Sequence, residues 1–379
     1  MYEAIRANAA QMDREDFGSV EYLDVGESVK IVVHLECAYY DVKLTVADKT
    51  YTDCFNDREP YDLLTHFWFV EKERLEQGMP LLLSALDSDD DGDLCCHMWT
   101  YNPEFADEAA LLRAYDHGLT VQETQTQTIA DGLIYRHILY ADRDGAPVHA
   151  FLLEMDSQKN TLYIGTPQDG YESVGVRATV PDMIRDAVQG GQPVLAATNA
   201  DFFDMFGDGH PSGLCVKNGK VVANRDSTRP FIGVCKDGTP VIARLSEQPQ
   251  LFENIYQAAA GLQMIVCDGK LSQWGPLEPF AYVRHPRTAA GVTKDGTVLL
   301  LAVDGRIPAY SNGASLVDLA KILISFGADR GVNMDGGGSS VVYTKDGDEF
   351  ILRNEPADLL RPTERLIREE YNSLLVVRR

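Results

Sequence analysis

The sequence lacks any long apolar stretch. No segment approaches the roughly 18 consecutive apolar residues of a membrane-spanning helix. The most apolar runs, such as 298–303, have the length of a β-strand. The first residues, MYEAIRANAAQMDRED, contain no apolar core of a signal peptide, which favours a cytoplasmic location. An envelope or secreted location is the alternative, should a leader precede these residues.

Basic residues are scarce as well. The 379 residues include 34 Lys and Arg against 58 Asp and Glu, which gives a formal net charge of −24. Such a charge repels phosphate, so we expect no general binding to nucleic acid or to an anionic membrane surface. Any anionic ligand would need a local group of arginines.

Cysteines are few and show no zinc-binding spacing. Their number is odd, and a chain of this length does not need disulfides to stabilise its core. We therefore expect mostly reduced thiols. The seven cysteines are Cys37, Cys54, Cys95, Cys96, Cys215, Cys235 and Cys267.

The length predicts two domains, since a typical domain has roughly 100–200 residues. Residues 1–120 are interpreted as a small mixed α/β accessory domain of unknown role, and 128–379 as a larger, β-rich domain. The polar segment TVQETQTQT between them is interpreted as the junction. In the first part the patterns predict strands at 29–35, 41–46 and 94–101 and helices at 61–77 and 106–115.

The larger part repeats a pattern of apolar run, Asn-Gly or Asp-Gly turn, and apolar run. These dipeptides favour tight hairpins because both residues tolerate positive φ. The turns are at 218–219, 237–238, 268–269, 295–296 and 346–347. Helices are predicted at 181–189 and 316–326, the latter with a capping box at Ser315 and Asp318. The fold class predicted for the whole chain is α+β, with hairpins and a few helices in the larger domain.

The string Asn-Met-Asp-Gly-Gly-Gly-Ser-Ser at 333–340 is the strongest candidate for a functional loop. Three consecutive glycines cost chain entropy, but they allow close approach of the backbone and can present N–H groups to an anion. The Gly-Lys-Ser/Thr ending of a nucleotide-binding P-loop is missing. A flexible hairpin turn is the simpler alternative, although it would not need the flanking Asp335 and Ser339.

Polar residues also stand beside three other apolar runs. Asn199-Ala200-Asp201 follows the run 194–197, and Asp304-Gly305-Arg306 follows 298–303. Arg287 and Thr288 precede the run 289–293, and Arg is the side chain that best matches a phosphate. The simpler interpretations are a strand end with buried aromatics for the first string and a surface ion pair for Arg287. His210 is interpreted as a loop residue.

In this order the four strings resemble the phosphodiester glycosidase family, over about residues 128–379. The resemblance implies hydrolysis of a sugar–phosphate diester at the anomeric carbon. It also implies a site, to which Asp201 and Arg306 are added with less weight because the resemblance does not fix them. The implied residues are Asn199, Arg287, Thr288, Asp304, Asp335, Gly336, Gly337, Gly338 and Ser339.

Glycoside cleavage commonly uses two carboxylates, about 5–5.5 Å apart for retention and about 6.5–9.5 Å apart for inversion of the anomeric centre. We expect Asp335 to be the base or nucleophile and Asp304 its partner, with the exchange of these roles as an alternative. Asn199 is the third expected catalytic residue. Arg287, Thr288, the glycine N–H groups and Ser339 are expected to hold the phosphate, where charge grows as the bond breaks.

Two other functions stay open. One is a glycan or cell-wall binding module without turnover. The other is a metal-dependent phosphodiesterase that cuts P–O bonds, which would require His210 near Asp201 and Asp335. No cofactor is expected, with one weak possibility of Ca²⁺. The string DSDDDG at 87–92 matches the start of a calcium loop, but Met98 stands where the bidentate Glu is needed.

The expected substrate is therefore a sugar phosphodiester or a phosphate-linked glycan. A polysaccharide such as an exopolysaccharide, a teichoic-type polymer or a nucleotide sugar would each supply this chemistry. The sequence does not define the sugar, the anomer or the oligomeric state.

Overall fold

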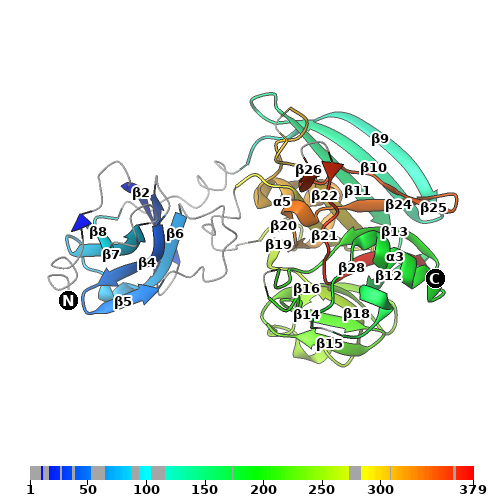
Figure 1. Cartoon of the computed structure of the whole chain (residues 1–379), viewed down its shortest axis with the longest axis horizontal. Helices are drawn as coiled ribbons and strands as arrows, with labels where there is room; N and C mark the ends of the chain where they lie inside the picture. Colours follow the sequence, from blue (N-terminus) through cyan, green and yellow to red (C-terminus); the bar gives the residue numbers. More distant parts are fainter. Residues whose placement is uncertain are drawn as a thin grey trace. The chain divides into compact units, whose positions relative to one another are not determined.

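The structure is a computed structural model that describes residues 10–11, 17–25, 28–35, 39–52, 65–87, 94–103, 116–172, 174–205, 207–272, 283–307, 309–361 and 364–379. The chain separates into two compact units, with the boundary between Ala114 and Tyr115 (Figure 1). Each unit is described by itself.

The first unit contains two antiparallel arrangements of strands around one apolar core, in which Leu44, Trp68 and Leu83 are fully buried. Strand β1 adds to its larger sheet in parallel. The sheet order β1-β8-β7-β4-β5 joins Ala10–Gln11, Leu94–Thr100, Pro80–Asp87, Tyr39–Val46 and Lys49–Thr52. The order β2-β3-β6 joins Phe17–Val25, Ser28–Leu35 and Thr65–Glu71. A short 3₁₀ helix, η1, follows at Lys72–Arg74.

The helix predicted at 61–77 is wrong where the structure describes it. Thr65–Glu71 is strand β6, which pairs with β3. His66, Trp68 and Val70 are buried while Phe69 is 44% exposed. Burial therefore alternates with a period of two residues, which is typical of a strand. Aromatic and β-branched residues fit such a half-buried strand. The predicted helix at 106–115 and most of the acidic string at 87–92 lie outside the described residues.

The second unit has three larger sheets that share one apolar core (Figure 1). The eight-stranded sheet, in the order β20-β19-β23-β21-β22-β11-β10-β9, joins Lys270–Leu271, Gln263–Cys267, Ala328–Met334, Arg287–Thr293, Val298–Val303, Pro147–Met155, Leu133–Ala141 and Thr120–Ala130. The order β12-β28-β13-β24-β25 joins Asn160–Gly165, Ser373–Arg378, Val194–Asn199, Val342–Asp346 and Glu349–Leu352. The order β15-β14-β18-β16-β17 joins Lys220–Asn224, Leu214–Lys217, Ile255–Ala260, Pro230–Cys235 and Pro240–Arg244.

Short elements complete this unit. Strands β26 (Leu359–Arg361) and β27 (Glu364–Arg365) pair with each other. The 3₁₀ helices are η2 (Pro167–Asp169), η3 (Pro249–Leu251) and η4 (Gly337–Ser339). All five predicted hairpins are confirmed, at the turns of β14–β15, β16–β17, β19–β20, β21–β22 and β24–β25.

The predicted α+β class is wrong, because the described residues are predominantly strands and contain two α-helices, α3 (Val180–Gln189) and α5 (Leu316–Ser325). Both helices were predicted. Thr179 caps α3, and Ser315 with Asp318 forms the expected capping box of α5. The excess of helix in the prediction came from the first 120 residues. In addition, the polar segment 120–128 is part of strand β9, which pairs with β10.

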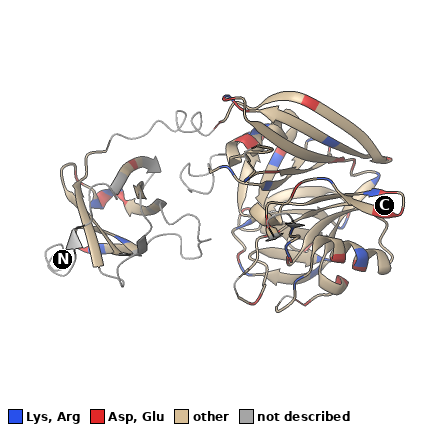
Figure 2. Ribbon diagram, turned by 45° about the horizontal axis from the view of Figure 1, so that its top comes forward, with Lys and Arg blue, Asp and Glu red and all other residues tan. Residues whose placement is uncertain are grey.

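The distribution of charged residues and the state of the cysteine thiols both agree with what the sequence predicts. Basic and acidic residues are interspersed along the strands and loops of the second unit (Figure 2). Cys215, Cys235 and Cys267, which lie in the described residues, are free thiols, as expected. No helix among the described residues is long and apolar enough to cross a membrane.

The sheet register positions the predicted site. In the eight-stranded sheet Arg287 at the start of β21 lies opposite Val303 at the end of β22. Thr288 lies opposite Met334 at the end of β23. Asp304 and Asp335, which directly follow these strands, therefore leave the sheet at the same edge.

Candidate active site

The carboxylate of Asp335 is held in a fixed orientation at the end of β23. Its Oδ2 accepts a hydrogen bond of 2.6 Å from Ser339 Oγ, and its Oδ1 accepts one of 2.9 Å from Gly336 N. Its own N–H donates to Ala200 O at 2.9 Å. The residue is half-buried. Asp335 is therefore an oriented carboxylate with access to solvent, as a base or nucleophile requires.

Asn199 and Thr288 support this loop from the protein interior. Asn199 Nδ2 donates to Asp335 O at 2.6 Å, and its Oδ1 accepts from Thr288 Oγ1 at 2.8 Å. Thr288 Oγ1 also lies 3.1 Å from Ser340 Oγ. Both side chains are fully or almost fully buried. Asn199 was expected among the catalytic residues and Thr288 at the phosphate. In the structure both link β13 and β21 to the loop through hydrogen bonds.

The three glycines are explained largely by close packing. A Cβ on Gly336 would lie 2.7 Å from Pro286 O, and Gly337 has a φ of +62°. Gly336 N donates to Asp335, and Gly337 N donates to Pro286 O at 2.8 Å. The hydrogen bonds of the described residues include none from Gly338 N–H. Gly338 is buried, and a Cβ on it would lie 2.0 Å from Asp358 Cγ, so close packing explains this glycine as well.

The two arginines of the site lie in different surroundings. The Arg287 guanidinium is buried and donates to Val283 O at 2.7 Å and to Ala314 O at 3.2 Å. Burial, and then the nearby Arg306, lower its pKa to about 9. Arg306 is exposed, has a φ of +62° and forms no ion pair among the described residues. Its guanidinium lies 3.2–3.3 Å from the position that a Cβ on Gly337 would take. Arg306 is therefore the cation that faces the loop.

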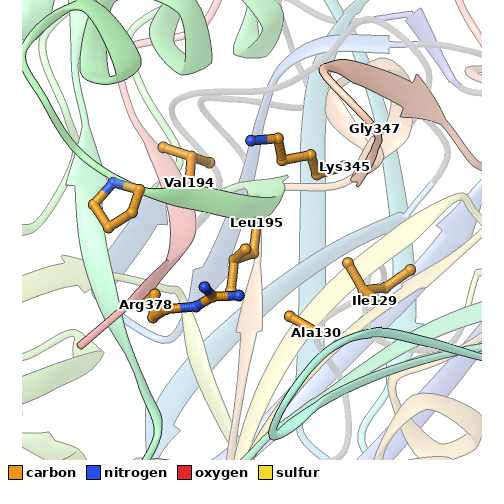
Figure 3. A pocket seen from close by; sticks show the side chains of 8 residues that line it. Ile129, Ala130, Val194, Leu195, Lys345, Gly347 and Arg378 are labelled. Atoms are coloured by element: carbon orange, nitrogen blue, oxygen red, sulfur yellow. The ribbon is translucent and has the colours of Figure 1, made fainter.

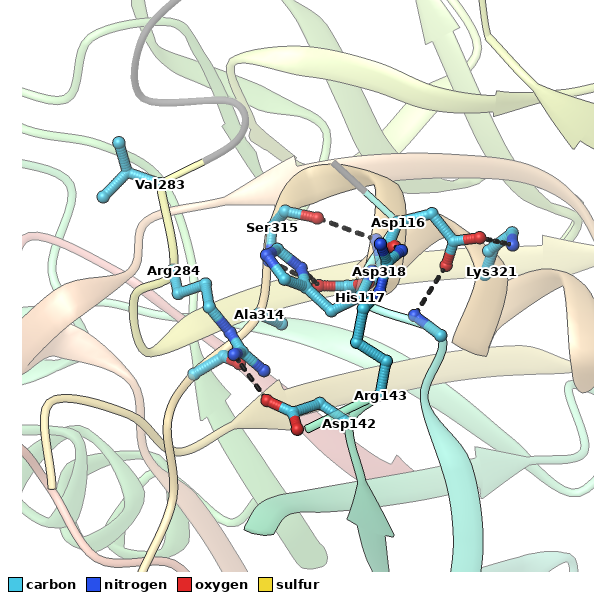
Figure 4. Close-up of polar contacts among 12 residues, drawn as sticks. Asp116, His117, Asp142, Arg143, Val283, Arg284, Ala314, Ser315, Asp318 and Lys321 are labelled. Carbon is cyan, nitrogen blue, oxygen red and sulfur yellow. Dashed lines mark hydrogen bonds and ion pairs between the residues drawn. The ribbon is translucent and has the colours of Figure 1, made fainter. Parts of the chain in front are cut away.

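Polar contacts of Asp318 and of Arg284 fix the backbone of the neighbouring segments (Figure 4). The buried Asp318 carboxylate accepts from Ser315 N at 3.0 Å and contacts His117 Nδ1 at 2.6 Å. Arg284 Nη1 donates to Asp142 at 2.6 Å. The segment before β9 is thus held to α5, and the segment before β21 is held to the turn between β10 and β11.

Asp304, the expected partner of Asp335, is fully buried, and both of its carboxylate oxygens accept hydrogen bonds within the protein. Its carboxylate accepts from Asn354 Nδ2 at 2.8 Å, from Glu355 N at 2.7 Å and from Tyr310 Oη at 3.1 Å. Burial raises its pKa to about 6. The arrangement organises the loops after β22 and β25 and leaves no carboxylate oxygen free for a substrate.

Two other buried acids feel the charge of Asp335. Burial first, and Asp335 in addition, raise the pKa of Asp201 and of Glu370 well above the ordinary values. Asp201 Oδ2 accepts from Gly213 N at 3.1 Å, and its N–H donates to Asn372 Oδ1 at 2.9 Å. The site is therefore centred on Asp335, next to two buried acids whose pKa values are raised.

The sequence reasoning missed the segment before β28. Arg368 donates to Asp358 Oδ2 at 3.0 Å through Nε and to Ser339 Oγ at 3.3 Å through Nη1. Glu370 and Asn372 follow at intervals of two residues. Polar residues that alternate directly before an apolar strand were the available signal, because in an extended chain they face one side.

The other expected elements lie elsewhere. His210 Nδ1 contacts Pro211 O at 2.8 Å, as a loop residue would. In the described parts of the chain no three His, Cys, Asp or Glu side chains are arranged to hold a metal ion. A pocket at the start of β13, opposite to Asn199, is lined by Ile129, Ala130, Pro193, Val194, Leu195, Lys345, Gly347 and Arg378 (Figure 3). It contains none of the expected site residues.

The second unit is thus a strand-rich domain that carries an oriented carboxylate on a glycine loop. Residues 192–369 match the family of the phosphodiester glycosidases. This match lies within the predicted range and confirms the resemblance for slightly less than half of the chain. The chain is a distant relative of glycosidases that act on phosphodiester-linked sugars.

The sequence relatives include two mammalian enzymes named N-acetylglucosamine-1-phosphodiester alpha-N-acetylglucosaminidase. The mouse enzyme is 28% identical over 180 residues and the human enzyme 28% identical over 184 residues. In both comparisons 43% of this chain is covered, and the chain spans about a third of the relative, 33%.

Solved structures share the fold. The catalytic domain of the zebrafish enzyme of the same name, auto-inhibited by its pro-peptide, superposes with a TM-score of 0.54 at 23% identity, over 69% of this chain and 89% of that one. A hypothetical protein from Synechocystis gives a TM-score of 0.51 at 11% identity, over 100% of this chain and 85% of that one. At these identities the likeness concerns the fold alone.

Proposed function

We propose that the protein hydrolyses the glycosidic bond of a sugar-1-phosphodiester, releasing the free sugar and a phosphomonoester. The observation that carries this proposal is the orientation of Asp335 by Ser339 and Gly336, beside an exposed arginine at the same loop. The bond to be cut joins the anomeric carbon, where a carboxylate can act, to the phosphate, which a cation can bind. Asp335 acts at the anomeric carbon, and Arg306 binds the departing phosphate.

The phosphate position follows from the available donors. Arg306 lies over Gly337, with its guanidinium 3.2–3.3 Å from the position that a Cβ on Gly337 would take. Donors that face the developing charge of the leaving group lower the barrier by about 2.7–4 kcal/mol each. A phosphodiester is already a good leaving group, so strong general-acid assistance is not needed. This chemistry is consistent with Asp304 being fully occupied.

The first test is an assay of sugar release. Methyl diesters of N-acetylglucosamine 1-phosphate and glucose 1-phosphate, in both anomers, are incubated with the wild type, with Asp335→Asn and with the matched surface variant Asp346→Asn. We expect free sugar from one anomer, about 10³-fold slower with Asp335→Asn and unchanged with the exposed Asp346→Asn. Release of sugar phosphate that EDTA abolishes would overturn the proposal in favour of a metal-dependent phosphodiesterase.

A further inference from the structure

Glu370 is a carboxyl group enclosed by the site. It is 1% exposed and lies in the extended segment before β28, where its backbone bonds to Ala178 in both directions, at 2.9 and 3.0 Å. Its Oε2 has no hydrogen-bond partner among the described residues. A buried carboxylate with an unpaired oxygen would be costly, whereas a protonated carboxyl group is tolerated far better.

The surroundings of Glu370 contain more negative than positive charge. The titratable groups that face it are Asp335 after β23, Asp358 before β26, Arg368 on its own segment and Tyr343 on β24. Arg368 Nη2 lies 2.8 Å from Asp358 Oδ2, and its Nη1 donates to Ser339 Oγ at 3.3 Å, so this cation is shared between Asp358 and Ser339. Burial, followed by the charge of Asp335, raises the pKa of Glu370 well above its ordinary value.

Ser339 connects the two carboxyl groups. Its hydroxyl interacts with the Glu370 carboxyl group, which lowers the pKa of that group and offsets part of the effect of burial, and it donates to Asp335 Oδ2 at 2.6 Å. A serine hydroxyl has a single proton but can accept additional hydrogen bonds. If Glu370 were ionised, it would compete with Asp335 for this proton. If Glu370 is protonated, it donates to Ser339 Oγ, and the proton of Ser339 stays on Asp335.

We propose that Glu370 is a positioning residue that remains protonated and donates its proton to Ser339 Oγ, which directs the only proton of Ser339 to Asp335. This inference rests on the proposed function, because it assigns a use to the orientation of Asp335. Glu370 itself does not touch the substrate. Its ionisation at high pH turns Ser339 away from Asp335, so Glu370 limits the activity on the alkaline side.

Infrared spectroscopy tests the protonation without any turnover. We expect the C=O stretch of protonated carboxylic acids in the wild type at pH 7, and loss of the Glu370 component of this band in Glu370→Gln while the Asp201 component remains. Asp201→Asn is the matched control, because Asp201 is the other fully buried acid near Asp335, and it should retain the Glu370 band. Thermal unfolding verifies that each variant is folded. A Glu370→Gln spectrum identical to the wild type would overturn the proposal.

Kinetics on the methyl phosphodiester then test the positioning. The side-chain amide of the E370Q variant can still donate to Ser339, whereas the side chain of E370L cannot, so we expect E370Q to be at least tenfold more active than E370L. The alkaline decline of the wild type should be absent in E370Q. Equal activities of the two variants, or an unchanged alkaline decline, would overturn the role. If no diester is cleaved by the wild type, the proposed function fails while the infrared result still decides the state of Glu370.

Discussion

Arg306 and Arg287 provide the sharpest contrast between a ligand-binding and a structural role. Arg306 is exposed and forms no ion pair among the described residues, so its replacement by Ala should change the free energy of unfolding by no more than about 0.5 kcal/mol. The lost contact to the phosphate should raise the barrier by about 2.7–4 kcal/mol, which corresponds to a fall in kcat/KM of about 10²–10³.

Arg287→Ala should have the opposite effect. The guanidinium is buried and donates to two backbone carbonyl groups, those of Val283 and Ala314. Hydrogen bonds from a charged donor contribute about 1.5–3 kcal/mol each, so the variant should be destabilised by about 3–6 kcal/mol. At roughly 2–4 °C per kcal/mol this loss lowers Tm by about 6–24 °C.

The assay combines urea unfolding with sugar release from the methyl phosphodiester. Arg306→Gly is a useful companion variant, because a φ of +62° favours glycine. It should be at least as stable as Arg306→Ala and equally impaired in kcat/KM. The reasoning is refuted if Arg306→Ala retains full kcat/KM, or if Arg287→Ala is as stable as the wild type.

Two further predictions concern stability. A Cβ on Gly338 would lie 2.0 Å from Asp358 Cγ, so Gly338→Ala should break the Asp358–Arg368 pair and cost about 1.5–3 kcal/mol in unfolding free energy. In a double-mutant cycle, Asp358→Ala should therefore cost less in the Gly338→Ala background than in the wild type. Additive costs of the two substitutions would contradict this prediction. Because the folded state raises the pKa of Asp304 from 3.8 to about 6, the proton on this group stabilises the fold fully below pH 3.8, and that contribution, about 3 kcal/mol, disappears as the pH rises through 6. Asp304→Asn should therefore lose less stability than the wild type between pH 4 and pH 7 in urea titrations, and parallel pH profiles would argue against the assignment.

Much of the site could be predicted from the sequence because its strings stand at the ends of strands. Arg287, Asp304 and Asp335 lie at one edge of the sheet, and Asn199 reaches the same loop from β13. The roles within this group could not be predicted. Whether an arginine is buried or exposed depends on the loops around it, and the occupancy of Asp304 depends on Asn354, 50 residues further along the chain.

The errors in the predicted secondary structure have local causes. The segment around Trp68 has apolar residues at both helical and strand spacing, and pairing with β3 decides between them. Strand β9 has no apolar period because it is exposed at the edge of its sheet, where Thr-rich alternation is the remaining signal. The charge pattern does not indicate Glu370, because its proposed role depends on its interaction with Ser339, which lies on a loop distant in the sequence.

Hydrolysis in ¹⁸O-labelled water shows which bond of the phosphodiester is cut. We expect water to attack the anomeric carbon, so the label appears in the free sugar and the phosphomonoester contains none. Asp335→Asn should suppress this labelled sugar. Label in the phosphate would show that the P–O bond is cut, and would contradict the proposed glycosidase.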